Sequence, residues 1–139
     1  MAAPFSGGCA CGAVRYECSA EPMLMGNCHC RDCQRASGGP FVSIVGVPKE
    51  ALKITGEVKY HEVAGDSGSP IKRGFCGHCG SRLFGFPSGV PFVGVAVGSL
   101  DDPSWYRPAF DIYTAPMVPQ RASTLFIEAA RWQVPSICM

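Results

Sequence analysis

The chain has 139 residues, of which 47% are apolar and 17% charged, and its formal net charge is +1. This length fits one domain, residues 1–139, that can bury a hydrophobic core without disulfide staples. Lys and Arg are scattered, with no basic stripe and no interleaved aromatic platform, so we expect no nucleic-acid partner. The N-terminal stretch lacks the basic and apolar segments of an export signal, and no apolar run reaches membrane-spanning length. We therefore expect a cytoplasmic protein without a membrane partner.

Nine cysteines in a chain of this length indicate either a disulfide framework or metal binding. An odd number, spaced as Cys-x-Cys and Cys-x-x-Cys, suits chelation better than separate bridges, because near neighbours in sequence converge easily on one ion. Seventeen glycines and twelve prolines, together with the high apolar content, predict a folded, turn-rich and mainly β protein.

The first cysteine pair is Cys9 and Cys11, flanked by glycines that let the backbone turn sharply. Two ligands cannot close a structural site, so this pair needs partners from elsewhere in the chain. A strand is predicted at 13–18, in which Cys18 shares a face with Val14 and Tyr16. We interpret Cys18 as a core residue rather than a spare ligand or reactive thiol.

The second group follows a short strand predicted at 23–25 and places Cys28, Cys30 and Cys33 within six residues. Three cysteines this close can share one metal ion. A structural zinc is normally closed by four protein ligands, whereas a catalytic zinc commonly keeps three and leaves one position open. The open-site interpretation leads, because His29, the alternative fourth ligand, sits between two ligands in a tight turn.

One or two helical turns are predicted over 31–36, ended by the Gly-Gly-Pro sequence that follows. Gln34, Arg35 and Ser37 would then lie close enough to bind a ligand in a pocket beside the metal. The alternative for each of these side chains is a solvated helix face.

The middle of the chain has the pattern of a β-meander, with strands predicted at 41–47, 52–55 and 58–63. His61 is expected on the surface of the last of these. The Gly- and Ser-rich stretch 64–70 is predicted to be a loop, either an inert connection or a lid.

The third cysteine group, Cys76 and Cys79, follows a strand predicted at 71–75 and forms a zinc knuckle, Cys-x-x-Cys with a glycine after it. The earlier pair, Cys9 and Cys11, supplies the two missing thiolates. We therefore predict a structural zinc held by four cysteines, with His78 exposed.

The remaining predicted strands are 82–86, 92–98 and 107–113, and the small residues of the second would allow close approach of a sheet or ligand. Ser123 is predicted to cap a helix over 124–132. Cys138 is interpreted as a free thiol.

The order Gly-Gly-Cys9-x-Cys11-Gly, then Cys28-x-Cys30-x-x-Cys33, then Phe75-Cys76-x-x-Cys79-Gly-Ser resembles the glutathione-dependent formaldehyde-activating (GFA) family. The resemblance spans residues 6–114 and leaves a divergent tail, 115–139. It implies a β-tent of antiparallel sheets organised around the four-cysteine zinc, with a second, catalytic zinc at the three-cysteine group. Two Zn²⁺ per chain are therefore expected.

The resemblance also implies a carbon–sulfur lyase that reversibly joins a thiol such as glutathione to formaldehyde. An open zinc would bind the thiol and lower its pKa, or polarise the aldehyde oxygen. A nearby group must then move a proton to the nascent alkoxide. Asp111, Tyr113, His61 and Arg35 are candidates for this role.

The chain departs from the family pattern at Asp111 and in the stretch that follows it. Many relatives carry a histidine where Asp111 stands, and a Pro-Trp pair soon after it, which stretch 115–120 lacks. We interpret Asp111 as a substitute for that histidine, in an altered substrate pocket. The alternative functions are a zinc-stabilised binding module with two closed sites, a thiol redox enzyme and, less favoured by the charge balance, a nucleic-acid zinc ribbon.

Overall fold

The computed structural model describes residues 2–65 and 68–117. In this part of the chain the strands are β1 (Phe5–Gly8), β2 (Arg15–Cys18), β3 (Leu24–Cys28), β4 (Val42–Pro48), β5 (Leu52–Thr55), β6 (Val58–Ala64), β7 (Pro70–Cys76), β8 (Arg82–Pro87), β9 (Phe92–Ala96) and β10 (Phe110–Ile112). The α-helix is α1 (Arg31–Ser37), and two 3-10 turns are η1 (Lys49–Ala51) and η2 (Val97–Ser99). With seven residues, α1 is far too short to span a bilayer, and no other helix in the described ranges comes closer.

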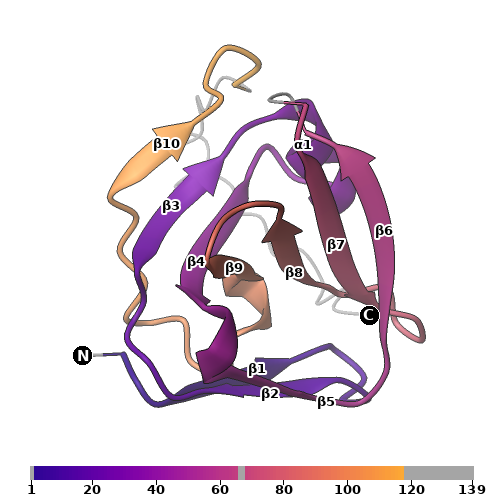
Figure 1. Cartoon of the computed structure of the whole chain (residues 1–139), viewed down its shortest axis with the longest axis vertical. Helices are drawn as coiled ribbons and strands as arrows, with labels where there is room; N and C mark the ends of the chain where they lie inside the picture. Colours follow the sequence, from indigo (N-terminus) through magenta and orange to yellow (C-terminus); the bar gives the residue numbers. More distant parts are fainter. Residues whose placement is uncertain (1, 66–67, 118–139) are drawn as a thin grey trace, which may run out of the picture.

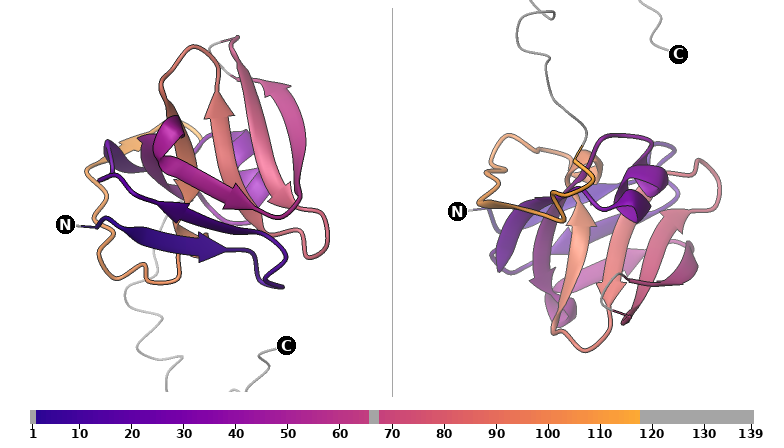
Figure 2. Two further views of the ribbon diagram at one scale, coloured as in Figure 1. Left: turned by 60° about the horizontal axis from the view of Figure 1, so that its bottom comes forward. Right: turned by 90° about the horizontal axis from the view of Figure 1, so that it is seen from above.

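The strands form two sheets. A three-stranded antiparallel sheet has the order β1-β2-β5, and a seven-stranded sheet has the order β10-β3-β4-β9-β8-β7-β6. In Figure 1 the small sheet lies across the base, and the large sheet curves above it from β10 on one side to β6 on the other. Figure 2 shows the same arrangement from the base and from the top. The mainly β, tent-like architecture expected from the sequence is confirmed.

One pairing departs from the antiparallel pattern, because β10 runs parallel to β3, with Asp111 opposite Asn27. This pairing joins a segment near the end of the described chain to the strand that carries Cys28. It therefore brings residues 110–113 beside the three-cysteine group.

The hydrophobic core lies between the two sheets. Tyr16 from the small sheet and Val14, just before β2, are fully buried in one cluster with Phe84 and Val95 from the large sheet. The rings of Tyr16 and Phe84 pack edge to face with centroids 5.3 Å apart, and the Tyr16 hydroxyl hydrogen-bonds Ser99 Oγ at 2.8 Å. Cys18 is 1% exposed, which confirms it as a core residue.

Several strand boundaries differ from those predicted. The first strand, β1, was not predicted, because its Gly-rich sequence has no apolar alternation; it forms by pairing with β2. The strand predicted at 92–98 ends at Ala96, where η2 begins and Ser99 Oγ donates to the Ala96 carbonyl. The strand predicted at 107–113 shortens to β10, which pairs with β3 from Gly26 to its last residue, Cys28. Ser123, the helix predicted over 124–132 and Cys138 lie outside the described residues.

Candidate metal centres and adjoining cavity

The first metal centre joins the two sheets at one end of the core. Cys9 follows β1, whereas Cys76 ends β7 and Cys79 lies in the turn to β8. This turn closes when the Gly80 amide donates to the Cys76 carbonyl at 2.9 Å, with Gly80 in the left-handed conformation (φ 75°) that glycine accommodates. The sulfurs of Cys9, Cys11, Cys76 and Cys79 all lie within 4.8 Å of one another.

The spacing of these four sulfurs fits a tetrahedral zinc. The Cys9–Cys11 and Cys11–Cys76 sulfur distances are 3.6 and 3.7 Å. A tetrahedron with metal–sulfur bonds of about 2.3 Å has edges of about 3.8 Å. The Val14 amide also donates to Cys9 Sγ at 3.2 Å, and the Ser81 hydroxyl lowers the pKa of Cys79 to about 5 by hydrogen bonding, so the surroundings of these two cysteines favour thiolates. This group could hold a metal ion without further ligands.

The second metal centre lies at the junction of β3 and α1. Cys28 is the last residue of β3, Cys30 caps the helix by accepting a hydrogen bond from the Cys33 amide at 3.3 Å, and Cys33 occupies the first turn. The three sulfurs lie within 4.8 Å of one another, and no fourth His, Cys or carboxylate of the described residues belongs to the group. Three convergent thiols with one open side are the donor set expected of a catalytic rather than a structural zinc.

His29 is not a ligand in this arrangement. Its side chain is buried outside the cysteine group, and Nε2 lies 2.7 Å from Asp111 Oδ1. Asn27 also donates to that carboxylate oxygen, at 3.1 Å. These two hydrogen bonds, from His29 first and Asn27 second, lower the pKa of Asp111. The alternative in which His29 closes the second site is therefore not supported by the structure.

A cavity of about 440 Å³ opens beside the three-cysteine group, on the face of the large sheet where Cys28, Cys30 and Cys33 all contribute to the lining. Most of its wall is apolar. The larger apolar side chains in the lining are Leu24, Val42, Ile44, Ile71, Phe84, Val90, Phe92, Phe110 and Ile112. A cavity of this size suits a small-molecule ligand.

Two arginines bring positive charge into this apolar wall. Arg73 from β7 is only 8% exposed, and Arg82 from β8 places Nη2 3.8 Å from Cys33 Sγ. A hydrogen bond from Cys28 and the charges of Arg82 and Arg73 lower the pKa of the Cys33 thiol to about 5. Thiolate is therefore favoured at the sulfur that faces the arginines. Neither arginine was singled out from the sequence, because each lies in an ordinary strand pattern and only the sheet brings them together.

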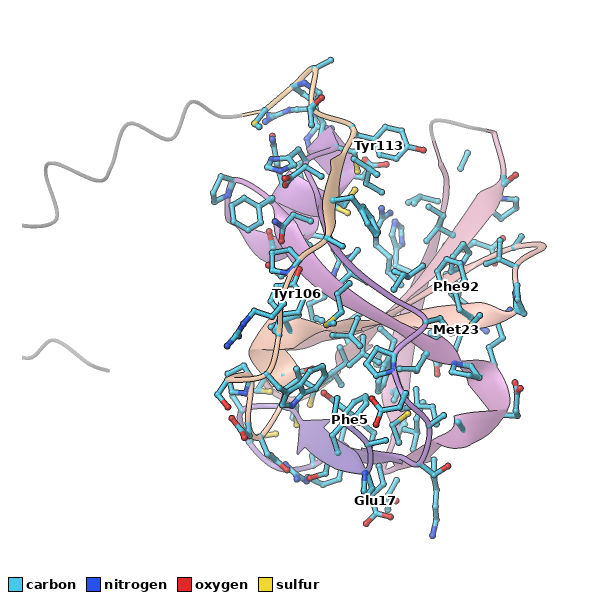
Figure 3. The ribbon with its side chains drawn as sticks, turned by 90° about the vertical axis from the view of Figure 1, so that its left-hand side faces the viewer. Phe5, Glu17, Met23, Phe92, Tyr106 and Tyr113 are labelled. Atoms are coloured by element: carbon cyan, nitrogen blue, oxygen red, sulfur yellow. The ribbon has the colours of Figure 1, made fainter. Side chains whose placement is uncertain are left out.

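The predicted proton-transfer residues are placed very differently. Tyr113, just after β10, lines the cavity, and Figure 3 shows its ring directed toward the side where Phe92 lies. Asp111 is absent from the cavity lining, because the alternation of β10 turns Phe110 and Ile112 inward. His61 and Arg35 are exposed and also lie outside the lining.

The helix residues predicted to bind a ligand also lie outside this cavity. Gln34 is buried and donates from Nε2 to the carbonyls of His29 and Pro116, at 3.0 and 2.9 Å. Ser37 lies at the C-terminal end of α1, where its hydroxyl accepts from the Gly39 amide. Arg35 lies on the exposed face of α1. The prediction for Gln34, Arg35 and Ser37 does not match the lining, because α1 turns this face toward 113–117 and solvent.

The chain has counterparts among known proteins. The model of the family described as glutathione-dependent formaldehyde-activating enzyme matches residues 4–116, most of the chain.

The chain belongs to the GFA family.

Its GFA relatives include fungal and bacterial proteins that carry the family's name. One from Phaeosphaeria nodorum is 33% identical, over 91% of this chain and 71% of the relative. One from Fusarium vanettenii is 29% identical, over 97% of this chain and 77% of the relative. One from Halomonas elongata is 31% identical, over 73% of this chain and 68% of the relative.

A solved structure, that of a Rhodobacter sphaeroides protein, is similar to this GFA chain in fold. Its TM-score is 0.55 with 23% sequence identity, and the match covers 69% of this chain and 87% of that one. This likeness concerns the fold alone.

Proposed function

We propose that this protein is a zinc-dependent carbon–sulfur lyase that joins a thiol to a small aldehyde, as the name of its relatives suggests for glutathione and formaldehyde. The observation that carries the proposal is the three-cysteine group, whose open side meets the cavity. In the proposal Cys9, Cys11, Cys76 and Cys79 hold a structural zinc, and Cys28, Cys30 and Cys33 hold a second, catalytic one.

Zinc held by three thiolates would offer one position to the substrate sulfur and keep it as thiolate at neutral pH. The remaining steps depend on residues of the protein. In the forward direction a carbon–sulfur bond forms, the carbonyl π bond breaks, and the proton lost by the thiol ends on the new hydroxyl. The product is a hemithioacetal, the S-hydroxymethyl adduct when the aldehyde is formaldehyde.

Two features of the cavity would assist this reaction. The apolar wall excludes water, which strengthens electrostatic interactions at the reacting atoms. Arg82, near Cys33, stabilises negative charge there and then on the developing alkoxide. In the proposal Tyr113 delivers the proton, and what supports this role is that Tyr113 lines the cavity whereas Asp111, His61 and Arg35 do not.

The test uses the purified protein and Cys33→Ser. Exchange between the thiol, formaldehyde and their adduct, followed by nuclear magnetic resonance, should be accelerated by the wild type and not by Cys33→Ser. Zinc should fall from about two to about one per chain in the variant, with the fold retained. Equal exchange rates with and without protein, for several thiols and aldehydes, would favour the binding-module alternative instead.

A further inference from the structure

The two arginines of the cavity present hydrogen-bond donors that have no acceptor. Within the described part of the chain, Arg73 Nε and Arg82 Nη1 are buried and make no hydrogen bond, and neither side chain is in an ion pair. A buried guanidinium with unsatisfied donors is strongly unfavourable unless an anion or another acceptor meets it. The cysteine group satisfies only part of this requirement, through the contact of Arg82 with Cys33.

The other charged side chain in the lining does not supply an acceptor for these arginine donors either. Asp32, from the first turn of α1, is half-buried and lies beyond ion-pair distance of both guanidinium groups. Three thiolates with one divalent ion would carry a net charge of −1 against the +2 of Arg73 and Arg82. With the −1 of Asp32 counted, the charges of the lining sum to zero, but the buried donors of Arg73 and Arg82 still have no acceptor.

Open, apolar space lies beside these donors. Gly85 stands directly opposite Arg73 in the β7–β8 register and opposite Gly94 in the β8–β9 register. A Cβ at Gly85 would meet no atom within 4 Å, so this part of the cavity is unfilled. Phe84, Phe92 and Ile44 line the cavity around it.

We infer that the cavity takes a thiol substrate with a carboxylate close to its sulfur, bound by Arg73 and Arg82, and an apolar body that fills the space over Gly85. This inference rests on the proposed function, in which the three-cysteine group receives the substrate sulfur. Arg82 Nη2 lies 3.8 Å from Cys33 Sγ, so an anionic group held by this guanidinium would lie close to the three-cysteine group that receives the substrate sulfur. Guanidinium N–H donors pair well with the two oxygens of a carboxylate, and both arginines line this one cavity.

Glutathione fits this description poorly. Its cysteine carboxyl is tied up in an amide, and its two free carboxylates lie at the far ends of the tripeptide. Much of its polar backbone and its charged amine would have to lie against a wall that is mostly aliphatic and aromatic. A mercaptocarboxylate with an aromatic or branched side chain has its polar and apolar parts in the required places.

The test measures binding to the cobalt-substituted protein through the change in its visible absorption. The ligands are 2-mercapto-3-phenylpropanoate, mercaptoacetate, which lacks the apolar body, 2-phenylethanethiol, which lacks the carboxylate, and glutathione. We expect the first to bind at least about tenfold more tightly than each of the others, since it alone uses both the arginines and the apolar wall.

Variants separate the two contributions. Arg73→Met should weaken the binding of 2-mercapto-3-phenylpropanoate and of mercaptoacetate by about tenfold or more, and it should leave the affinity for 2-phenylethanethiol unchanged. Gly85→Leu should weaken both phenyl-containing thiols and leave mercaptoacetate unchanged. Lys72→Met is the matched control, because this neighbouring residue is exposed, with its ammonium 4.5 Å above the Tyr60 ring, and it should alter no affinity.

The outcomes distinguish the inference from the function on which it rests. If no thiol changes the cobalt spectrum of the wild type, the proposed function is wrong. If thiols bind but Arg73→Met weakens 2-phenylethanethiol as much as the carboxylates, or if glutathione binds most tightly, the inference is wrong and the open site stands. A thermal melt of each variant shows whether lost binding reflects unfolding. Arg82→Met is a second variant that removes one of the two positive charges.

Discussion

The two cysteine groups use the same side chain for different purposes, and their surroundings explain the difference. The four-cysteine group connects β1 with β7 and the turn to β8, and two of its four residues are exposed. The three-cysteine group is confined to the β3–α1 junction and opens on the apolar cavity with its two arginines. A centre that links sheets contributes to folding, whereas a centre that opens on a cavity is available to a ligand.

The largest expected effect comes from breaking the four-cysteine group. Cys76→Ser should lower the free energy of unfolding by about 5 kcal/mol or more, because the link between the sheets is lost together with the metal. Circular dichroism melts and zinc analysis measure this. Cys33→Ser is the matched control and should keep most of the wild-type melting temperature. Equal destabilisation by both variants would show that the two groups do not differ in this way.

Graded removal of metal should separate the groups in one sample. We expect a chelator to abolish turnover while the far-ultraviolet circular dichroism is unchanged, because three protein ligands release an ion more readily than four. The second equivalent of metal, held by the four-cysteine group, should be released only when the protein unfolds. Metal release, activity and circular dichroism are followed together. Simultaneous loss of all three signals would contradict the prediction.

Tyr113→Phe tests the proton-transfer role at the cavity. Removing only the hydroxyl should lower kcat by about a hundredfold with little change in KM or in melting temperature. Tyr60→Phe, on the exposed face of β6, is the matched control and should have wild-type kcat. A wild-type kcat for Tyr113→Phe would assign the proton to another group.

Asp111→Asn should have the smallest effect on turnover, within about threefold, because Asp111 faces His29 rather than the cavity. Asp111→Asn should instead change how the stability of the fold depends on pH. The pKa of Asp111 is lowered in the folded protein, so its carboxylate stabilises the fold fully above the unfolded-state pKa of about 4, and this is lost as the pH falls through the folded pKa.

The melting-temperature difference between Asp111→Asn and wild type should therefore be constant above about pH 5 and narrow below about pH 4. Scanning calorimetry over this range measures it. A loss of kcat as large as that of Tyr113→Phe would instead place Asp111 in the reaction.

The sequence by itself determined the two candidate metal centres, because ligand chemistry depends on residue type and short spacing. Cys-x-x-Cys with a following glycine has few structural solutions, and three cysteines in six residues must converge. The β class also followed from local patterns of apolar residues and turns, as did the burial of Cys18 and the exposure of His61 and His78.

Tertiary structure decided what surrounds those centres. Arg73, Arg82 and Gly85 become neighbours of the three-cysteine group only through the order and register of β7, β8 and β9. The parallel pairing of β10 with β3 places Tyr113 at the cavity and turns Asp111 away from it. These contacts join residues distant in the chain, and strand order and register, which create them, are set by packing of the whole core rather than by any local pattern.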